Sequence, residues 1–346
     1  MKIFKYLFIF TIFLTTALIA DHNNACPAKP ECGCPPCGCA DLKTPTISAY
    51  NFPARVDVCG SYDFFVKGTY IYWQPYEEQM LIGYFEDVTN NDREFLYMDF
   101  QHKSGFKVGA GYNFSYDDWT AYLEYTRFHA TNTTSISALP PWSDEFNWHW
   151  GAPGADFFPS RERLKIDLDM LDLEFSRWEY RGKCLIFNPF FGLKGGWLDQ
   201  SFRQQIDTTN GLSTAQSDSR FIGLRTGLYS DWKLCYGFSF FGKNALSLVC
   251  QKMYNIKSSF PNGSTQTYTR VMSTSQYNVT PIVELIIGAK WQSYFYKNNY
   301  HFDVSAGYEL QYFWDQNYMW QNLTSENDNS GSLNFQGLNI SANFDF

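Results

Sequence analysis

Residues 106–126 read FKVGAGYNFSYDDWTAYLEYT and contain two runs of alternating side chains that meet at Asp117-Asp118. Apolar or aromatic residues fill every second position before the two aspartates, and the alternation resumes from Trp119. A period of two is typical of a half-buried β-strand, and a short polar connection between two such runs indicates an antiparallel hairpin. The stretch therefore predicts a hairpin with one apolar face and one polar face.

The same alternation recurs from Val58 to Phe346 and predicts ten strands. One of them, 232–256, is interpreted as a single long strand with a bulge at Gly242, whereas a turn at 242–244 would raise the count toward twelve. Short turns are expected at 116–118, 181–184, 230–233 and 296–299, and long loops at 75–103, 131–160, 202–218, 257–273 and 316–331. Short turns on the periplasmic side and long loops outside are typical of transmembrane barrels. We therefore predict an all-β, up-and-down antiparallel barrel of about ten strands in the bacterial outer membrane.

The composition agrees with such a barrel and excludes several other classes. Phe, Tyr and Trp make up 19% of the 346 residues and charged residues 18%, yet the mean hydropathy is −0.34. Disordered chains contain few aromatic residues, and helical membrane proteins need long apolar runs. The formal charge of −8 provides no basic surface for nucleic acid. A soluble β-sandwich remains the alternative for period-two strands, but the aromatic faces and the alternating connection lengths favour the barrel.

The N-terminus has the layout of an export signal. Lys2 and Lys5 precede an apolar run from Tyr6 to Ile19 that ends at Ala20, which is typical of a cleaved signal peptide rather than a membrane anchor. We predict a signal peptide at 1–20, a Cys/Pro-rich flexible tail at 21–57 and the barrel at 58–346. The chain is expected to end in a strand whose terminal aromatic residue, Phe346, is recognised by the barrel assembly machinery.

The tail holds five closely spaced cysteines among prolines and glycines. An exported protein meets an oxidising compartment, and with an odd total of nine cysteines at least one is either free or bonded to another molecule. We expect intermolecular disulfides with Cys-rich envelope proteins or a second copy, because Cys59, Cys184 and Cys235 fall on the same periplasmic side. A zinc site and a disordered tail with incidental thiols are the alternatives. The tail cysteines are Cys26, Cys32, Cys34, Cys37 and Cys39.

Several segments resemble the pore-forming major outer membrane proteins of the Legionella type, which also occur in chlamydia-related bacteria. They are YIYWQPYE (70–77), FKVGAGY (106–112), DWT (118–120), EYT (124–126), PFFGLKGGWLDQ (189–200) and GLRTGLYSDW (223–232). The resemblance covers most of residues 60–346 and contains no catalytic signature. It implies an abundant outer-membrane porin or surface antigen, in some cases involved in adhesion. The tail is similar to the chlamydia-related branch, whose envelopes resemble a disulfide-crosslinked coat.

Strand parity assigns a set of charged side chains to the lumen, and their signs nearly balance. Small barrels near eight strands fill with side chains, so about ten strands predict a narrow or plugged pore for small solutes, including ions. Alternatively, these charges pair with one another and hold the shape of the barrel. They are Asp63, Lys67, Lys107, Glu124, Asp172, Glu174, Lys194, Arg225, Lys243, Glu284, Lys290, Asp303 and Glu309.

An enzyme is the least favoured class. His301 and Asp303 share one predicted strand face, a spacing that orients an imidazole, but nothing identifies a nucleophile and no Gly-x-Ser-x-Gly occurs. We expect no enzymatic activity, no cofactor and no metal.

An adhesin or a structural coat protein with little transport is the main alternative to a porin. The loop 140–158 is unusually aromatic and is expected to plug the barrel mouth, to touch a neighbouring copy or to contact a host surface. Its rings include Trp142, Phe146, Trp148 and Trp150.

Overall fold

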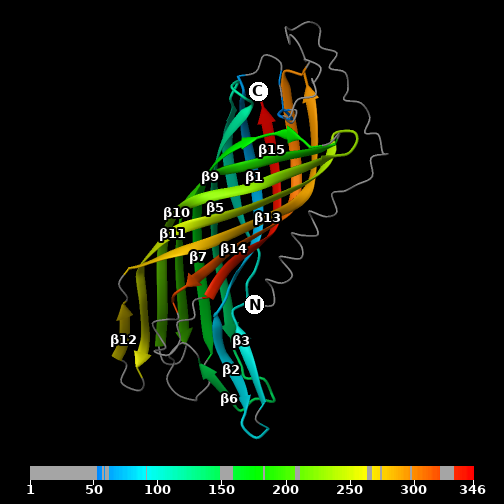
Figure 1. Ribbon diagram of the computed structural model, residues 1–346. Coiled ribbons are helices and arrows are strands. Elements are labelled where there is room, and N and C mark those ends of the chain that lie inside the picture. The colour runs from blue at the N-terminus through cyan, green and yellow to red at the C-terminus, as the bar shows by residue number, and fades with distance from the viewer. Residues whose placement is uncertain are drawn as a thin grey trace.

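Ten antiparallel strands close into a tilted barrel in the computed structural model (Figure 1). The structure describes residues 53–56, 58, 62–90, 92–148, 159–181, 184–206, 211–262, 267–272, 275–296, 298–319 and 331–346. Each barrel strand pairs with its two neighbours, and β1 pairs with β15 to close the ring. The predicted ten-strand barrel is therefore confirmed. The strands are β1 (Phe64–Glu77), β4 (Lys103–Asn113), β5 (Trp119–Ile136), β7 (Ser160–Arg177), β9 (Leu185–Ile206), β10 (Gly211–Lys233), β11 (Phe238–Asn262), β13 (Gln276–Phe295), β14 (Tyr300–Asn317) and β15 (Gly331–Asp345).

Shorter strands lie at the two ends of the barrel. β2 (Leu81–Asp87) pairs with β3 (Asp92–Tyr97) and with β6 (Glu145–Trp148) in a separate sheet, which projects below the barrel in Figure 1. β12 (Thr267–Met272) extends β11 on the same side, and β8 (Glu179–Tyr180) pairs with β9 at the other end. Among the described residues there is no helix with the length and hydropathy of a membrane span.

The tight turns form where consecutive residues adopt positive φ. Asp117 and Asp118 have φ of 57° and 56°, so the predicted hairpin turn is present. Two central residues with positive φ give the turn the twist that antiparallel strands need. Tyr236 and Gly237 do the same at 55° and 82°, so the turn expected at 230–233 lies at 234–237 instead.

The long strand that follows is a single strand, but its bulge is not at Gly242. Gly242 pairs in continuous register with both Ser230 and Ile287. The register shift lies between Gln216 and Asp218 on β10, opposite Asn255, whose φ is 56°. A single residue with positive φ inserted in one strand is typical of a bulge.

The loops expected at 202–218 and 257–273 are largely strand. β9 continues to Ile206 and β10 begins at Gly211, while β11 runs to Asn262. Similarly, β2 and β3 occupy much of the loop expected at 75–103, and β5 extends to Ile136 in the loop expected at 131–160. The barrel is therefore taller than the sequence predicted.

On some strands of the barrel, β7 and β9 among them, the two faces exchange character partway along the strand. On β7 every second residue from Leu164 to Met170 faces inward and is apolar and buried. The residues that alternate with them, from Arg161 to Asp169, face outward and are charged. From Leu171 the outward face becomes apolar and the inward face carries Asp172 and Glu174. The alternation of burial continues through the change without a bulge, so the chemistry of the faces changes while the direction of the side chains does not.

The exchange falls at a matching height on the neighbouring strands. On β9 the outward residues are mostly apolar from Phe187 to Trp197 and polar from Asp199 onward. This length fits the roughly 9–11 residues that a tilted strand needs to cross a bilayer. We call the part between the exchange and the short turns the membrane half and the part on the side of the small sheet the extracellular half. Below then means toward the short turns and above means toward the small sheet, which is the reverse of the view in Figure 1.

Candidate functional site

Five buried aromatic rings form a layer across the barrel, which we call the aromatic septum. Trp73, Phe128 and Phe335 lie with ring centroids 5.4–5.8 Å apart. Phe313 continues from Phe335 at 5.8 Å and Phe221 follows at 6.3 Å. The rings come from β1, β5, β15, β14 and β10, so the contacts run from one wall of the barrel to the other. Aromatic pairs at these spacings pack favourably and bury a large apolar area.

Buried charges form a second layer in the membrane half, which we call the charged belt. The Lys194 ammonium lies 2.8 Å from Asp172 Oδ1 and 3.0 Å from Glu284 Oε1. Arg225 donates from Nε to Glu174 Oε1 at 3.0 Å and from Nη2 to Glu284 Oε2 at 2.9 Å. Because these partners come from β7, β9, β10 and β13, the belt ties together strands on different sides of the barrel.

The belt continues toward β4 and β14. Lys243 donates to Glu174 Oε1 at 2.8 Å. Lys107 Nζ lies 2.6 Å from Glu309 Oε1 and 5.0 Å from the centre of the Trp73 ring. Lys107 therefore connects the charged belt to the aromatic septum through an ion pair and a cation–π contact. Lys67 and Glu124 share the inward faces of β1 and β5, and Tyr122 donates to Glu124 Oε2 at 2.7 Å.

Polar side chains gather again near the periplasmic mouth. Lys290 donates to Asp231, and Asn343 Nδ2 donates to Asp303 at 3.1 Å. His301, Asp303 and Asp345 place potential metal-ligand atoms within 4.8 Å of one another. However, His301 Nδ1 already lies 2.7 Å from Asp345 Oδ2. This contact and the Asn343 amide give both carboxylates hydrogen-bond partners.

Asp63 differs from the other predicted lumen charges. It precedes β1, has a φ of 58°, and its carboxylate lies 3.9 Å from Arg55 Nη2. The remaining twelve residues of the predicted set lie on inward strand positions, and most of them contact one another. Asp63 instead lies at the rim of the barrel.

Residues 53–56 lie across the periplasmic mouth. The Ala54 amide donates to the Trp178 carbonyl at 2.9 Å, and Arg55 Nη1 donates to the Phe114 carbonyl at 3.0 Å. Between this segment and the barrel lies a cavity of about 90 Å³, lined in part by Asp231 and Lys290. The segment therefore helps to cover this end of the barrel.

Two features of the interior were not predicted from the sequence. The septum was not predicted because period-two alternation points to one apolar face per strand, whereas on β1 the inward Ile71 and Trp73 alternate with the outward Tyr70 and Tyr72 and are apolar as well. Asp231, the partner of Lys290, was placed in a turn at 230–233. Adjacent apolar pairs such as Met170-Leu171 are the signal that would have revealed a second apolar face.

The cysteines of the barrel have different states. Cys184 is disulfide-bonded, whereas Cys235 and Cys250 are exposed and free. Cys59 and the five tail cysteines lie outside the described residues, as does Trp150. The proposed intermolecular disulfides therefore stay a prediction.

The aromatic loop packs into the small extracellular sheet. Phe146 on β6 is fully buried against Phe85, with ring centroids 4.8 Å apart, and against Trp148 at 4.6 Å. Ile82 and Ile136 complete this core. Trp142 lies at its edge and is 41% exposed. These rings stabilise a sheet that projects beyond the barrel.

Comparison with known proteins identifies the family of the chain. A family model described as "Legionella pneumophila major outer membrane protein precursor" matches residues 58–346. No protein of curated function matches. Among solved structures, the outer membrane protease OmpT from Escherichia coli has a TM-score of 0.44 and 9% identity, with 83% of this chain and 97% of that chain covered. The P. putida toluene transporter TodX has a TM-score of 0.23 and 7% identity, with 82% and 90% covered.

Proposed function

Because this chain belongs to the Legionella major outer membrane protein family, an assignment that covers residues 58–346, we propose that it is an outer-membrane barrel sealed at rest. Its role is that of a structural or adhesive surface protein, and passage of solutes is secondary. The membrane half contacts lipid, while the extracellular half and the small sheet face the surroundings of the cell.

The aromatic septum carries this proposal. Trp73, Phe128 and Phe335 are fully buried and pack against one another inside the barrel, so apolar rings fill the part of the lumen that they occupy. Apolar constrictions stop ions by excluding water. The charged belt below the septum is itself satisfied by ion pairs, as expected for a barrel small enough to fill with side chains.

The small extracellular sheet supports the surface role. Its buried face holds Phe146, and β3 exposes Phe95 and Tyr97 on the other face, with 53% and 56% of their surface accessible. Apolar side chains gathered on an exposed sheet are typical of a contact surface. A host surface or a second copy of the chain would bind there.

A narrow passage for small solutes is the second candidate function. The polar interior of the membrane half favours it, because such rings of charge select permeating solutes. This function requires the septum to open, since Phe335 and Phe313 pack 5.8 Å apart above the belt.

Planar-bilayer recording distinguishes the two functions. We expect almost no conductance from the wild-type protein and new openings from the double variant Trp73→Ala/Phe335→Ala, which removes two rings of the septum. The matched control is Tyr72→Ala/Leu338→Ala, which changes paired outward residues of the same two strands. Regular, ion-selective openings in the wild type would establish the passage as the resting function.

A cell-binding assay tests the adhesive role. Deleting residues 140–148 removes β6 and the Phe146 core contact, so we expect binding to host cells or self-association to fall while the barrel keeps its heat-modifiable gel mobility. Unchanged binding and association would leave the sheet without this role.

A further inference from the structure

Two cations face each other on the outer wall of the barrel, and neither forms an ion pair with a described residue. Arg220 on β10 and Lys252 on β11 are register partners, and both are exposed on the outward face. In place of an ion pair, Arg220 lies 5.3 Å from the centre of the Tyr254 ring, and Lys252 lies 5.3 Å from the centre of the Tyr277 ring. Like charges directly opposite on neighbouring strands are destabilising. An anion between them would relieve this repulsion.

The height of the pair on the wall coincides with the edge of the membrane half. Arg220 pairs with Trp197, the last outward apolar residue of β9, and Ile222 and Leu224 follow directly below it. Tryptophan and tyrosine at such positions mark the level of the lipid headgroups in outer-membrane barrels. The two cations therefore lie where the phosphates of the outer leaflet are found.

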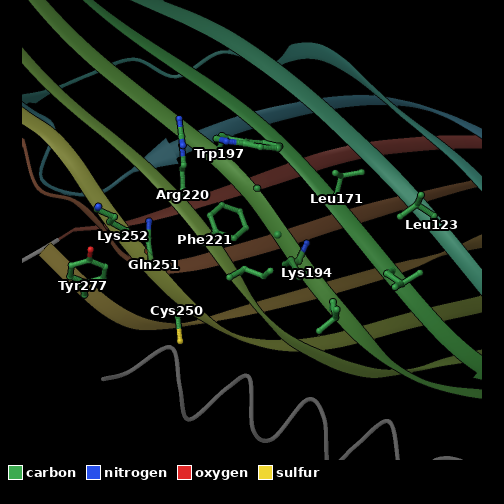
Figure 2. A pocket seen from close by; sticks show the side chains of 15 residues that line it. Leu123, Leu171, Lys194, Trp197, Arg220, Phe221, Cys250, Gln251, Lys252 and Tyr277 are labelled. Atoms are coloured by element: carbon green, nitrogen blue, oxygen red, sulfur yellow. The ribbon is translucent and has the colours of Figure 1, made fainter. Parts of the chain in front are cut away.

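An apolar hollow lies in the wall next to the pair, on the side of the membrane half, and Figure 2 shows the side chains that line it. Gly195 lies between Leu171 and Ile222 in the row beneath Trp197, and an added Cβ at Gly195 would meet its nearest atom at 3.5 Å. The missing side chain leaves a depression edged by Leu193 and Cys250. An apolar depression with two cations at its upper end matches an amphiphile with acyl chains and an anionic head.

We propose that Arg220, Lys252 and the hollow at Gly195 form a binding site for a phosphorylated, multiply acylated glycolipid of the outer leaflet. The phosphate lies between the guanidinium and the ammonium group, and an acyl chain occupies the hollow. Asp199 and Asp218 lie one row above the cations and reduce their attraction for a free anion. The acyl chain is therefore needed for binding, which favours a lipid over inorganic phosphate.

The same row on β5 and β7 has a different pairing and serves as an internal comparison. There Arg127 is the register partner of Asp169, so its charge has a counter-charge on the neighbouring strand. The site is therefore specific to the β10–β11 side of the barrel rather than a property of the whole row.

Lipid binding by purified full-length protein tests the site. The probes are diphosphoryl lipid A, its dephosphorylated form and inorganic phosphate, and the readout is native mass spectrometry in detergent. We expect Arg220→Gln/Lys252→Gln to weaken binding of the diphosphoryl lipid by about tenfold or more, as for the loss of charge-assisted hydrogen bonds. Gly195→Leu fills the hollow and should weaken both lipids while leaving both cations in place.

Arg161→Gln/Arg163→Gln is the matched control, since it removes two exposed outward cations of β7 far above the hollow. Heat-modifiable mobility confirms folding of each variant. Unchanged lipid binding in the cation variant would overturn the proposal, as would inorganic phosphate competing as well as the lipid. If the cation variant fails to fold, Gly195→Leu alone decides, because unchanged binding of both lipids in that variant would also overturn it.

Discussion

The membrane half and the extracellular half of this barrel share the same ten strands, but on strands such as β7 and β9 they have opposite faces. Below the exchange, Leu171 and Leu193 face lipid while Asp172 and Lys194 face inward. Above it, Leu168 and Leu198 are buried inside while charged residues face outward. Whether lipid or water surrounds a part of the barrel therefore decides whether its outward or its inward residues are apolar. One half follows the rules of a membrane protein and the other those of a soluble one.

This difference separates two kinds of interior stability. The extracellular half is held by apolar packing around the aromatic septum, as in soluble cores. The interior of the membrane half cannot be stabilised by apolar packing, because the apolar residues of this half face lipid. Buried ion pairs hold this interior together instead. Removing one partner of such a pair leaves an uncompensated buried charge.

The largest effect is expected in the charged belt. Glu284→Gln removes the charge that faces both Lys194 and Arg225, and should lower the free energy of unfolding by about 3–5 kcal/mol, the range for breaking a buried pair. Denaturant titration in lipid vesicles measures it. Glu94→Gln, on the exposed strand β3, is the control and should change little. Equal effects of the two variants would show that the belt is not a buried network.

The same substitution on one face of one strand compares the halves directly. Leu193→Lys places a charge against lipid and should cost about 2–4 kcal/mol, as at the middle of a bilayer. Ser201→Lys lies on the same outward face of β9, in the extracellular half, and should be nearly neutral. The folding free energy in vesicles of defined thickness measures both. A similar cost at Ser201 would place the bilayer edge higher than we infer.

The small extracellular sheet should be separable from the barrel. Phe146→Ala removes a fully buried ring from its core and should unfold β2, β3 and β6 locally. Limited proteolysis should then cleave 81–97, while the barrel keeps its heat-modifiable mobility. Leu96→Ala, at the edge of the same core, serves as the milder control. Loss of barrel mobility would show that the two parts fold as one unit.

The smallest effect concerns a row of like charges in the extracellular half. Asp167, Asp199 and Asp218 are register partners, and partial burial together with the other two carboxylates raises the pKa of Asp199. A carboxyl group whose pKa is raised by folding stabilises the folded protein while it is protonated. This stabilisation is lost as the pH rises and the group becomes charged. Asp199→Asn should therefore stabilise the protein slightly at pH 7 and have no effect near pH 3, as measured by thermal denaturation. A destabilised variant at pH 7 would show that the Asp199 charge is favourable.

The strands and their number were predictable because period-two alternation survives the exchange of faces. The hairpin at Asp117-Asp118 was found from its sequence, whereas the turn at Tyr236-Gly237 was expected too early, because the polar stretch 230–233 lies at the end of β10 and the turn itself contains apolar residues. The inward charges were predictable from parity. The septum was not, because the apolar face was assumed to be the lipid face along the whole strand.

Which charged side chains contact one another depends on how the strands close into a barrel, and not on the alternation within each strand. Arg225 and Glu284 are 59 residues apart, and their ion pair follows from the order of strands around the barrel. Local spacing carries no information about which inward charges meet. The switch of the apolar face from inward to outward at Met170-Leu171, in contrast, is visible in the sequence once water and lipid are both considered as surroundings of the strand.

Lipid-borne quenching along the outward face of β9 tests the two-half barrel most directly. A fluorescent unnatural amino acid placed in turn at Phe191, Leu193, Ser201 and Gln205 reports contact with brominated acyl chains. We predict strong quenching at Phe191 and Leu193 and none at Ser201 and Gln205. Quenching that continues through Ser201 and Gln205 would contradict the account, because the bilayer would then surround the half that we assign to the extracellular side.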